Sequence, residues 1–85
     1  MFKTMAEIKA ANKAAGRFFF SPDTMRFFES RIEAGPFNNR FVTSEKPPHE
    51  PRRFTVRTAN DDGTISPAEE HFTTRAAAIN AAQGS

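Results

Sequence analysis

The sequence predicts an α+β domain, on two observations. Before residue 37 apolar side chains recur at helical spacing, and after it they alternate with a period of two, as is typical of strands. The order of these segments is helix, helix, strand, strand, strand, helix. This order predicts a three-stranded antiparallel sheet covered on one face by helices. At 85 residues we expect a single domain, 1–85.

The first helix is expected over residues 5–15. Thr4 is suited to cap its N-terminus, and Gly16 stands where a left-handed residue commonly ends a helix. Three cations follow one another along a single side of this segment: Lys9, Lys13 and Arg17. The spacing predicts a basic ridge beside the apolar stripe of the helix.

The second helix is expected over residues 22–34, between two strong local signals. Ser21 is a typical N-cap and Pro22 a typical first helical residue, while Gly35 and Pro36 are typical of a helix stop. The apolar stripe expected to face the core is Met25, Phe28 and Ile32. Phe27 lies outside this stripe, so it is internal only if the helix buries two faces. The alternative is an exposed ring that is used in binding.

Ten phenylalanines, with no tryptophan and no tyrosine, are expected to fill the core. A buried phenylalanine leaves no polar group that needs a partner. The "RFFF" segment is interpreted as an extended connection whose rings pack inward. If these rings or Phe27 were exposed, a symmetric dimer would be a natural way to cover them.

Two strands that pair antiparallel are expected in "NRFVTSE" and "RRFTVRTAN". In the second of them, Phe54, Val56 and Thr58 are expected to face the core, and Arg53, Thr55 and Arg57 to face water. The proline-rich "KPPHEP" between them predicts a projecting loop, because proline donates no ladder hydrogen bond.

The end of the chain is expected to form a turn, a strand and a helix. "NDDGT" predicts the turn, and the third strand follows near residues 64–66 or 70–73. Thr73 or Thr74 is expected to cap the helix "RAAAINAAQ". Its expected packing face is Ala76, Ile79 and Ala82 or Gln83.

The composition argues against catalysis and against a bound metal or cofactor. The chain has no cysteine and two isolated histidines, and it lacks both the G-x-S-x-G nucleophile motif and a glycine-rich phosphate loop. We therefore expect no enzyme, no cofactor and no small-molecule substrate. No apolar run reaches membrane-spanning length, so we expect a soluble intracellular protein without membrane contact.

The charge distribution favours one surface for binding. Residues 1–60 carry a balance of +5 and residues 61–85 a balance of −3. The candidate contact residues are Lys9, Lys13, Arg17, Arg40, Lys46, His49, Arg52, Arg53, Arg57 and Arg75. Arginines on a strand face can hold phosphates with two parallel hydrogen bonds. The alternative is a solvated face that protects the sheet edge.

The last half of the chain, from "FVTSEKPPHEP" to "AAAINAA", resembles the double-stranded RNA-binding domain. That family places a G-P-x-H loop in the minor groove and a lysine cluster on the phosphates. Here Lys46-Pro47-Pro48-His49 stands at the loop, with lysine in place of glycine, and Arg75 alone stands at the cluster. The resemblance implies binding of duplex RNA or DNA through Lys46, His49, Arg52, Arg53 and Arg75.

A second resemblance covers most of the chain. The stretches "ANKAAG", "FF" and "TMRFFESR" resemble a group of short uncharacterised proteins encoded by bacteriophages, prophages and plasmids. This resemblance implies a small accessory protein that binds, and often blocks, a host machine such as a defence complex. The sequence thus predicts a binding or inhibitory module, a monomer or homodimer, whose partner is a host protein or a nucleic acid.

Overall fold

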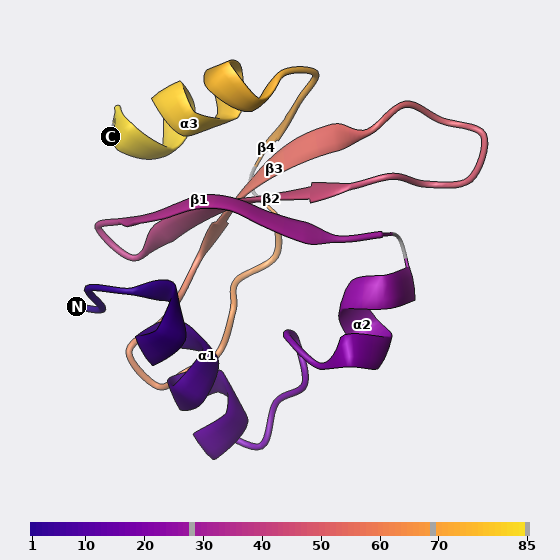
Figure 1. The fold of residues 1–85 in the computed structure, drawn as a ribbon. Helices are drawn as coiled ribbons and strands as arrows, with labels where there is room; N and C mark the ends of the chain where they lie inside the picture. The colour runs from indigo at the N-terminus through magenta and orange to yellow at the C-terminus, as the bar shows by residue number, and fades with distance from the viewer. Residues whose placement is uncertain (28, 69, 85) are drawn as a thin grey trace.

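A four-stranded antiparallel sheet with helices on both of its faces forms the centre of the protein (Figure 1). The computed structural model describes residues 1–27, 29–68 and 70–84. The strands follow the order β1-β2-β3-β4 across the sheet. The elements in chain order are α1 (Met5–Ala14), α2 (Pro22–Phe27), β1 (Arg31–Phe37), β2 (Arg40–Glu45), β3 (Arg53–Thr58), β4 (Glu70–Phe72) and α3 (Arg75–Gln83).

The α+β class and the antiparallel sheet are confirmed, but the sheet has four strands where the sequence predicts three. The additional strand is β1, which occupies the second half of the predicted helix 22–34. Glu29 has a φ of 50° and ends the helical turn before it, and β1 then pairs along β2. Pairing with a neighbouring strand overrides the local helix signals, because it satisfies the backbone groups of β2 that a helix would leave open.

Gly35 and Pro36 lie inside β1 and do not stop a helix. They lie where the β1–β2 register shifts, on the edge of the sheet, which is where a strand tolerates proline. A Cβ atom on Gly35 would come within 2.7 Å of the Phe41 Cβ, so this close crossing of β1 and β2 requires glycine.

The predicted hairpin of β2 and β3 is confirmed, with Val42 opposite Val56. α3 packs on the face of the sheet that carries Val42 and Val56. Ala78 and Ala82 of the helix are buried against these two valines. Thr74 is the N-cap of α3, and its side chain accepts a hydrogen bond from the Ala77 N–H at 3.2 Å. The expected packing face was wrong at Ala76, which is exposed, and Ala78 is buried in its place beside Ile79 and Ala82.

The opposite face of the sheet is covered as well, which corrects the expectation of one wet face. α1 lies below it in Figure 1, and Ile8 of α1 packs in one cluster with Phe41 and Ala59. A capping box starts this helix: Thr4 and Glu7 each accept hydrogen bonds from the other's backbone. The predicted helix thus forms, although it ends at Ala14 and leaves Arg17 beyond its last turn.

Asn12 ties α1 to two other segments. The Asn12 side chain is buried, donates to the Gly63 carbonyl at 2.9 Å and accepts from the Phe19 N–H at 3.2 Å. The predicted turn at residues 60–64 is thereby fixed against α1, and so is the start of the segment that leads to α2. Asn12 therefore positions the aromatic segment 18–20 relative to the sheet.

The prediction that the phenylalanines fill the core holds only in part. Phe41 is fully buried, whereas Phe18 is 73% exposed and Phe27 is 76% exposed. The expectation that Phe27 is internal was wrong, because α2 is short and buries none of its residues. Phe28, which was assigned to the apolar stripe with Met25 and Ile32, lies outside the described residues. Within the described part of the chain, no helix is long and apolar enough to cross a membrane.

Candidate functional site

Three adjoining hollows form a groove that follows the aromatic segment 18–20. One end of the groove lies beside α1, and the other lies between α2 and the sheet. The first, of about 320 Å³, shares Asn12, Arg17 and Phe18 with the second, of about 630 Å³. The second shares Phe19 and Thr24 with the third, of about 490 Å³. We call this feature the aromatic groove, because consecutive phenylalanines line it from one end to the other.

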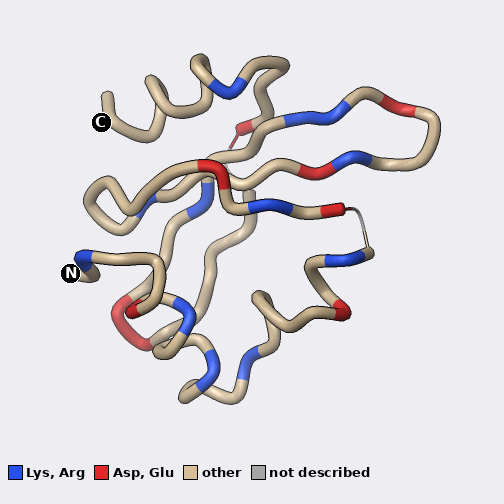
Figure 2. Tube along the Cα trace, viewed as in Figure 1, with Lys and Arg blue, Asp and Glu red and all other residues tan. Residues whose placement is uncertain are grey.

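The basic end of the aromatic groove is formed by α1 and the segment after it. Lys9, Lys13 and Arg17 line the first hollow. These side chains make no ion pair with any carboxylate among residues 1–27, 29–68 and 70–84. Figure 2 shows the cations of α1 and the following segment gathered at one corner of the molecule. Of the ten residues predicted for binding, these three lie together and keep their charge available to a ligand in one hollow.

Arg17 also faces the acidic turn at residues 60–64. Two hydrogen bonds from Thr64, through its hydroxyl at 2.7 Å and its N–H at 3.0 Å, are the main reason that the pKa of Asp62 lies below its ordinary value. The positive charge of Arg17 lowers the pKa of Asp62 further. Asp62 thus stays ionised at neutral pH and marks the limit of the basic end.

Phe18 separates the first and second hollows. Its ring is 73% exposed and lines both of them. A large exposed ring next to unpaired cations is a typical stacking surface for a flat, anionic ligand. The sequence analysis assigned this ring to packing. The signal that it overlooked is the position of Phe18 directly after Arg17, at the end of the basic ridge.

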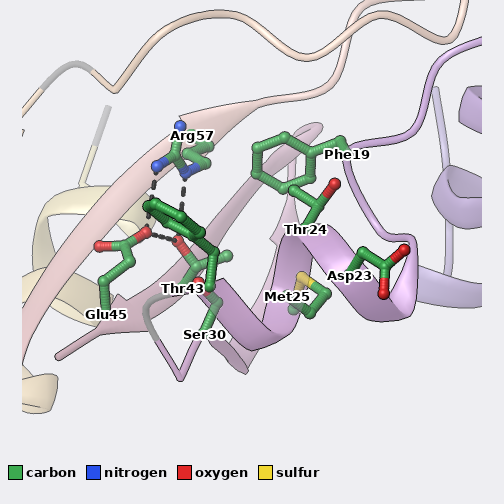
Figure 3. A pocket seen from close by; sticks show the side chains of 9 residues that line it. Phe19, Asp23, Thr24, Met25, Ser30, Thr43, Glu45 and Arg57 are labelled. Carbon is green, nitrogen blue, oxygen red and sulfur yellow. Dashed lines mark hydrogen bonds and ion pairs between the residues drawn. The ribbon is translucent and has the colours of Figure 1, made fainter. Parts of the chain in front are cut away.

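The far end of the aromatic groove lies between α2 and the sheet. Figure 3 shows Arg57, Glu45 and Thr43 on one side of this hollow and Phe19, Thr24 and Met25 on the other. Arg57 Nη2 lies 3.0 Å from Glu45 Oε1, and the Arg57 guanidinium lies 5.0 Å from the centre of the Phe19 ring. The side chains of Arg57 and Glu45 are 18% and 9% exposed, so both polar groups are held at the base of the hollow.

Arg57 was predicted to face water on a contact surface, and this was wrong. Thr43, Glu45 and Arg57 alternate along β2 and β3 on the same face, and this face is covered by the aromatic segment. Glu45 and Thr43 were not predicted as site residues. Their alternation with Arg57 across the hairpin was the available signal, because residues two apart on a strand share a face.

Two further candidate arginines are used in ion pairs. Arg52 donates to Ser44 Oγ at 2.7 Å and lies 3.8 Å from the Glu29 carboxylate. Arg75 lies 3.4 Å from Glu33 Oε1 and donates to the Glu33 carbonyl. Arg52 thus links the segments before β1 and β3 to β2, and Arg75 links α3 to β1. The structure therefore does not bring the ten candidates together as one basic surface.

The remaining candidates lie away from the aromatic groove. Lys46, His49 and Arg53 are exposed on or next to the loop between β2 and β3, where His49 has a φ of 63°. Arg40 is half-buried at the opposite end of β2. The described residues contain no group of three side chains that could hold a metal ion.

One family model matches the chain over residues 4–83, and it is described as a family of unknown function, DUF7447. The chain belongs to this family. The match spans all three helices and all four strands, so the aromatic groove lies entirely inside the DUF7447 region. Neither the comparison with curated proteins nor the comparison with solved structures gives a match.

Proposed function

We propose that this DUF7447 protein is a non-enzymatic binding module that holds single-stranded nucleic acid in the aromatic groove. The observation that carries the proposal is the run of adjoining hollows from three cations, which make no ion pair among the described residues, past an exposed phenylalanine to a polar pocket. Proteins that bind single strands combine a basic track for the backbone with rings on which bases stack.

A single strand fits the groove better than a duplex. Phe18 and Phe27 can stack only on bases whose faces are open, and in a duplex these faces are covered by neighbouring base pairs. The resemblance to double-stranded RNA-binding domains depends on Arg52 and Arg75 among others, and both of these are held in ion pairs with glutamates. Fewer cations are thus left on that side for the phosphates of a duplex.

A nucleic acid also fits better than an acidic host protein. The groove places cationic groups beside exposed aromatic rings, and a single strand likewise joins anionic groups to flat rings. As an accessory protein of a phage or mobile element in the bacterial cytoplasm, a binder of this kind would act by occupying single strands that a host machine needs. Capture of a host protein, or self-association that covers Phe18 and Phe27, would be the competing outcomes of the experiments below.

Binding of a labelled single-stranded oligonucleotide should weaken with salt and depend on the basic end. We expect fluorescence anisotropy to give a slope of log K against log salt of about −2, since three phosphate contacts contribute about −0.7 each for a single strand. The triple variant Lys9→Gln, Lys13→Gln, Arg17→Gln should bind about 100-fold more weakly at 0.1 M salt and lose most of this slope.

The matched control is the double variant Lys46→Gln, Arg53→Gln, which removes exposed cations outside the groove. It should keep the affinity and the slope of the unchanged protein for the single strand. Equal losses of affinity in the triple variant and the double variant would contradict the proposal. So would tighter binding of a duplex than of the single strand of the same sequence. A mass that doubles with concentration and no oligonucleotide binding would show instead that a second copy covers the rings.

The change Phe18→Ala should weaken oligonucleotide binding without changing its salt dependence. Base stacking on an aromatic side chain contributes about 1–3 kcal/mol, so we expect a loss of about 10-fold or more in anisotropy titrations. The slope against salt should stay the same because no cation is removed. Since Phe18 is mostly exposed, the temperature of thermal unfolding should be nearly unchanged. A variant that loses the salt slope together with its affinity would refute the stacking role.

A further inference from the structure

The far hollow of the aromatic groove differs from the basic end in its charge. Its lining carries one guanidinium, from Arg57, and two carboxylates, from Glu45 and Asp23. The basic end carries three cations and no carboxylate among its described lining residues. A phosphate is therefore attracted to the basic end and repelled from the far hollow. The occupant of the far hollow should be a neutral group.

The base of the far hollow presents a fixed polar edge. Arg57 donates from Nε to Thr43 Oγ1 at 3.2 Å and from Nη2 to Glu45 Oε1 at 3.0 Å. Glu45 Oε1 also accepts from Thr43 at 3.2 Å, and Oε2 accepts from Thr55 at 3.0 Å. These bonds orient the carboxylate and the guanidinium before any ligand arrives, as a selective polar contact requires.

This edge keeps one donor and one acceptor available. Within the described residues Arg57 Nη1 has no hydrogen-bond partner, and Glu45 Oε2 accepts one bond where a carboxylate oxygen can accept two. An aliphatic occupant would bury both groups unpaired, which is costly. The matching occupant carries a hydrogen-bond acceptor for Arg57 and a donor for Glu45.

The walls of the far hollow favour a flat ring. Phe19, Met25 and Phe27 line it, and α2 buries none of its residues, so the helix stands away from the sheet and leaves room between them. At about 490 Å³ the hollow lies within the usual size range of small-ligand sites. A neutral flat ring that carries both donor and acceptor atoms on its rim is the description of a nucleobase.

We infer that the far hollow, named here the Glu45 pocket, is a base-reading pocket that takes one unstacked nucleobase of the bound strand. The inference rests on the proposed function, because the basic end and Phe18 deliver the strand to the pocket. The pocket selects among bases through Glu45 and Arg57, while the rest of the groove binds any sequence. Single-stranded binding is then sequence-dependent at one position.

The first test uses uncharged nucleosides, which need no phosphate contact. Adenosine, cytidine, guanosine and uridine are titrated against protein with ¹³C-labelled methionine methyl groups. We expect a saturable shift at Met25, which lines the pocket, and none at Met5, which packs with Ile8 and Phe41 and does not line it. The triple variant of the basic end should show the same Met25 shift. Absence of a Met25 shift with all four nucleosides would overturn the inference.

The second test measures base preference with oligonucleotides that differ at one central base. We expect the unchanged protein to prefer one base over the poorest by about tenfold, which is what one well-placed pair of hydrogen bonds supplies. Glu45→Gln replaces the acceptor by a donor at nearly the same size, so it should change the order of preference. Lys46→Gln, at an exposed position outside the aromatic groove, should leave the order unchanged.

The outcomes separate the inference from the proposed function. Oligonucleotide binding that depends on the basic end, without base preference and without a Met25 shift, would retain the proposed function and remove the base-reading pocket. A Met25 shift with nucleosides, together with oligonucleotides that bind no more tightly than nucleosides, would retain the pocket and remove the proposed function. If Glu45→Gln does not fold, the Met25 titration of the unchanged protein still decides the matter.

Discussion

Glu45→Ala is expected to lower the free energy of unfolding by about 3–5 kcal/mol, which is the usual cost of removing one partner from a buried ion pair. The side chains of Glu45 and Arg57 are 9% and 18% exposed, and Glu45 also accepts hydrogen bonds from Thr43 and Thr55. Its removal would leave one guanidinium and two hydroxyl groups without their acceptor. Chemical denaturation followed by circular dichroism would measure the loss.

The size of this loss matters because a domain of this length has about 4–13 kcal/mol of stability in all. The matched control is Asp23→Ala, which removes the carboxylate of the exposed ion pair with Arg26 at 3.9 Å. It should cost less than about 1 kcal/mol. Replacing both members of the buried pair, Glu45→Leu with Arg57→Met, should be less harmful than Glu45→Ala alone. A loss below about 1 kcal/mol for Glu45→Ala would show that the pair is solvated.

The basic end and the Glu45–Arg57 pair show which parts of the site the sequence could predict and which it could not. Lys9, Lys13 and Arg17 were predicted together because their spacing is local and they lie within one helix and the turn after it. Arg57 was predicted as a site residue, but it was expected to face water. Its partner Glu45 is twelve residues away, and whether their shared face meets water depends on where segment 18–20 packs. That packing depends on Asn12, which bonds both to Phe19 and to the distant Gly63.

The same division between local and distant causes holds for the fold. Helix caps at Thr4, Ser21 and Thr74 lie where the sequence predicts them, because each depends on residues within one turn. β1 was missed because "RIEA" carries no local strand signal, and it becomes a strand by pairing with β2. Ser44 and Arg75 then hold Glu33 of β1 through its side chain. Such contacts join residues that are far apart in the sequence, so local sequence patterns do not predict them.

Gly63→Ala is expected to lower the free energy of unfolding by about 3–5 kcal/mol, from backbone strain and from a steric clash. Gly63 has a φ of 91°, a conformation that side chains with a Cβ rarely adopt. A Cβ at this position would run into the backbone carbonyl of Ala11 and come within 3.2 Å of the Ala15 Cβ. The turn at residues 60–64 would have to move away from α1, and the hydrogen bond from Asn12 to the Gly63 carbonyl would break.

Gly16→Ala is the matched control, because it separates strain from clash. Gly16 also has a left-handed φ, of 74°, but a Cβ there would meet nothing within 4 Å. It should therefore cost only the strain, about 1–2 kcal/mol. Because Asn12 also positions Phe19, Gly63→Ala should weaken oligonucleotide binding in protein that is still folded, whereas Gly16→Ala should not. Equal losses of stability in the two variants would mean that the turn and α1 are not in close contact.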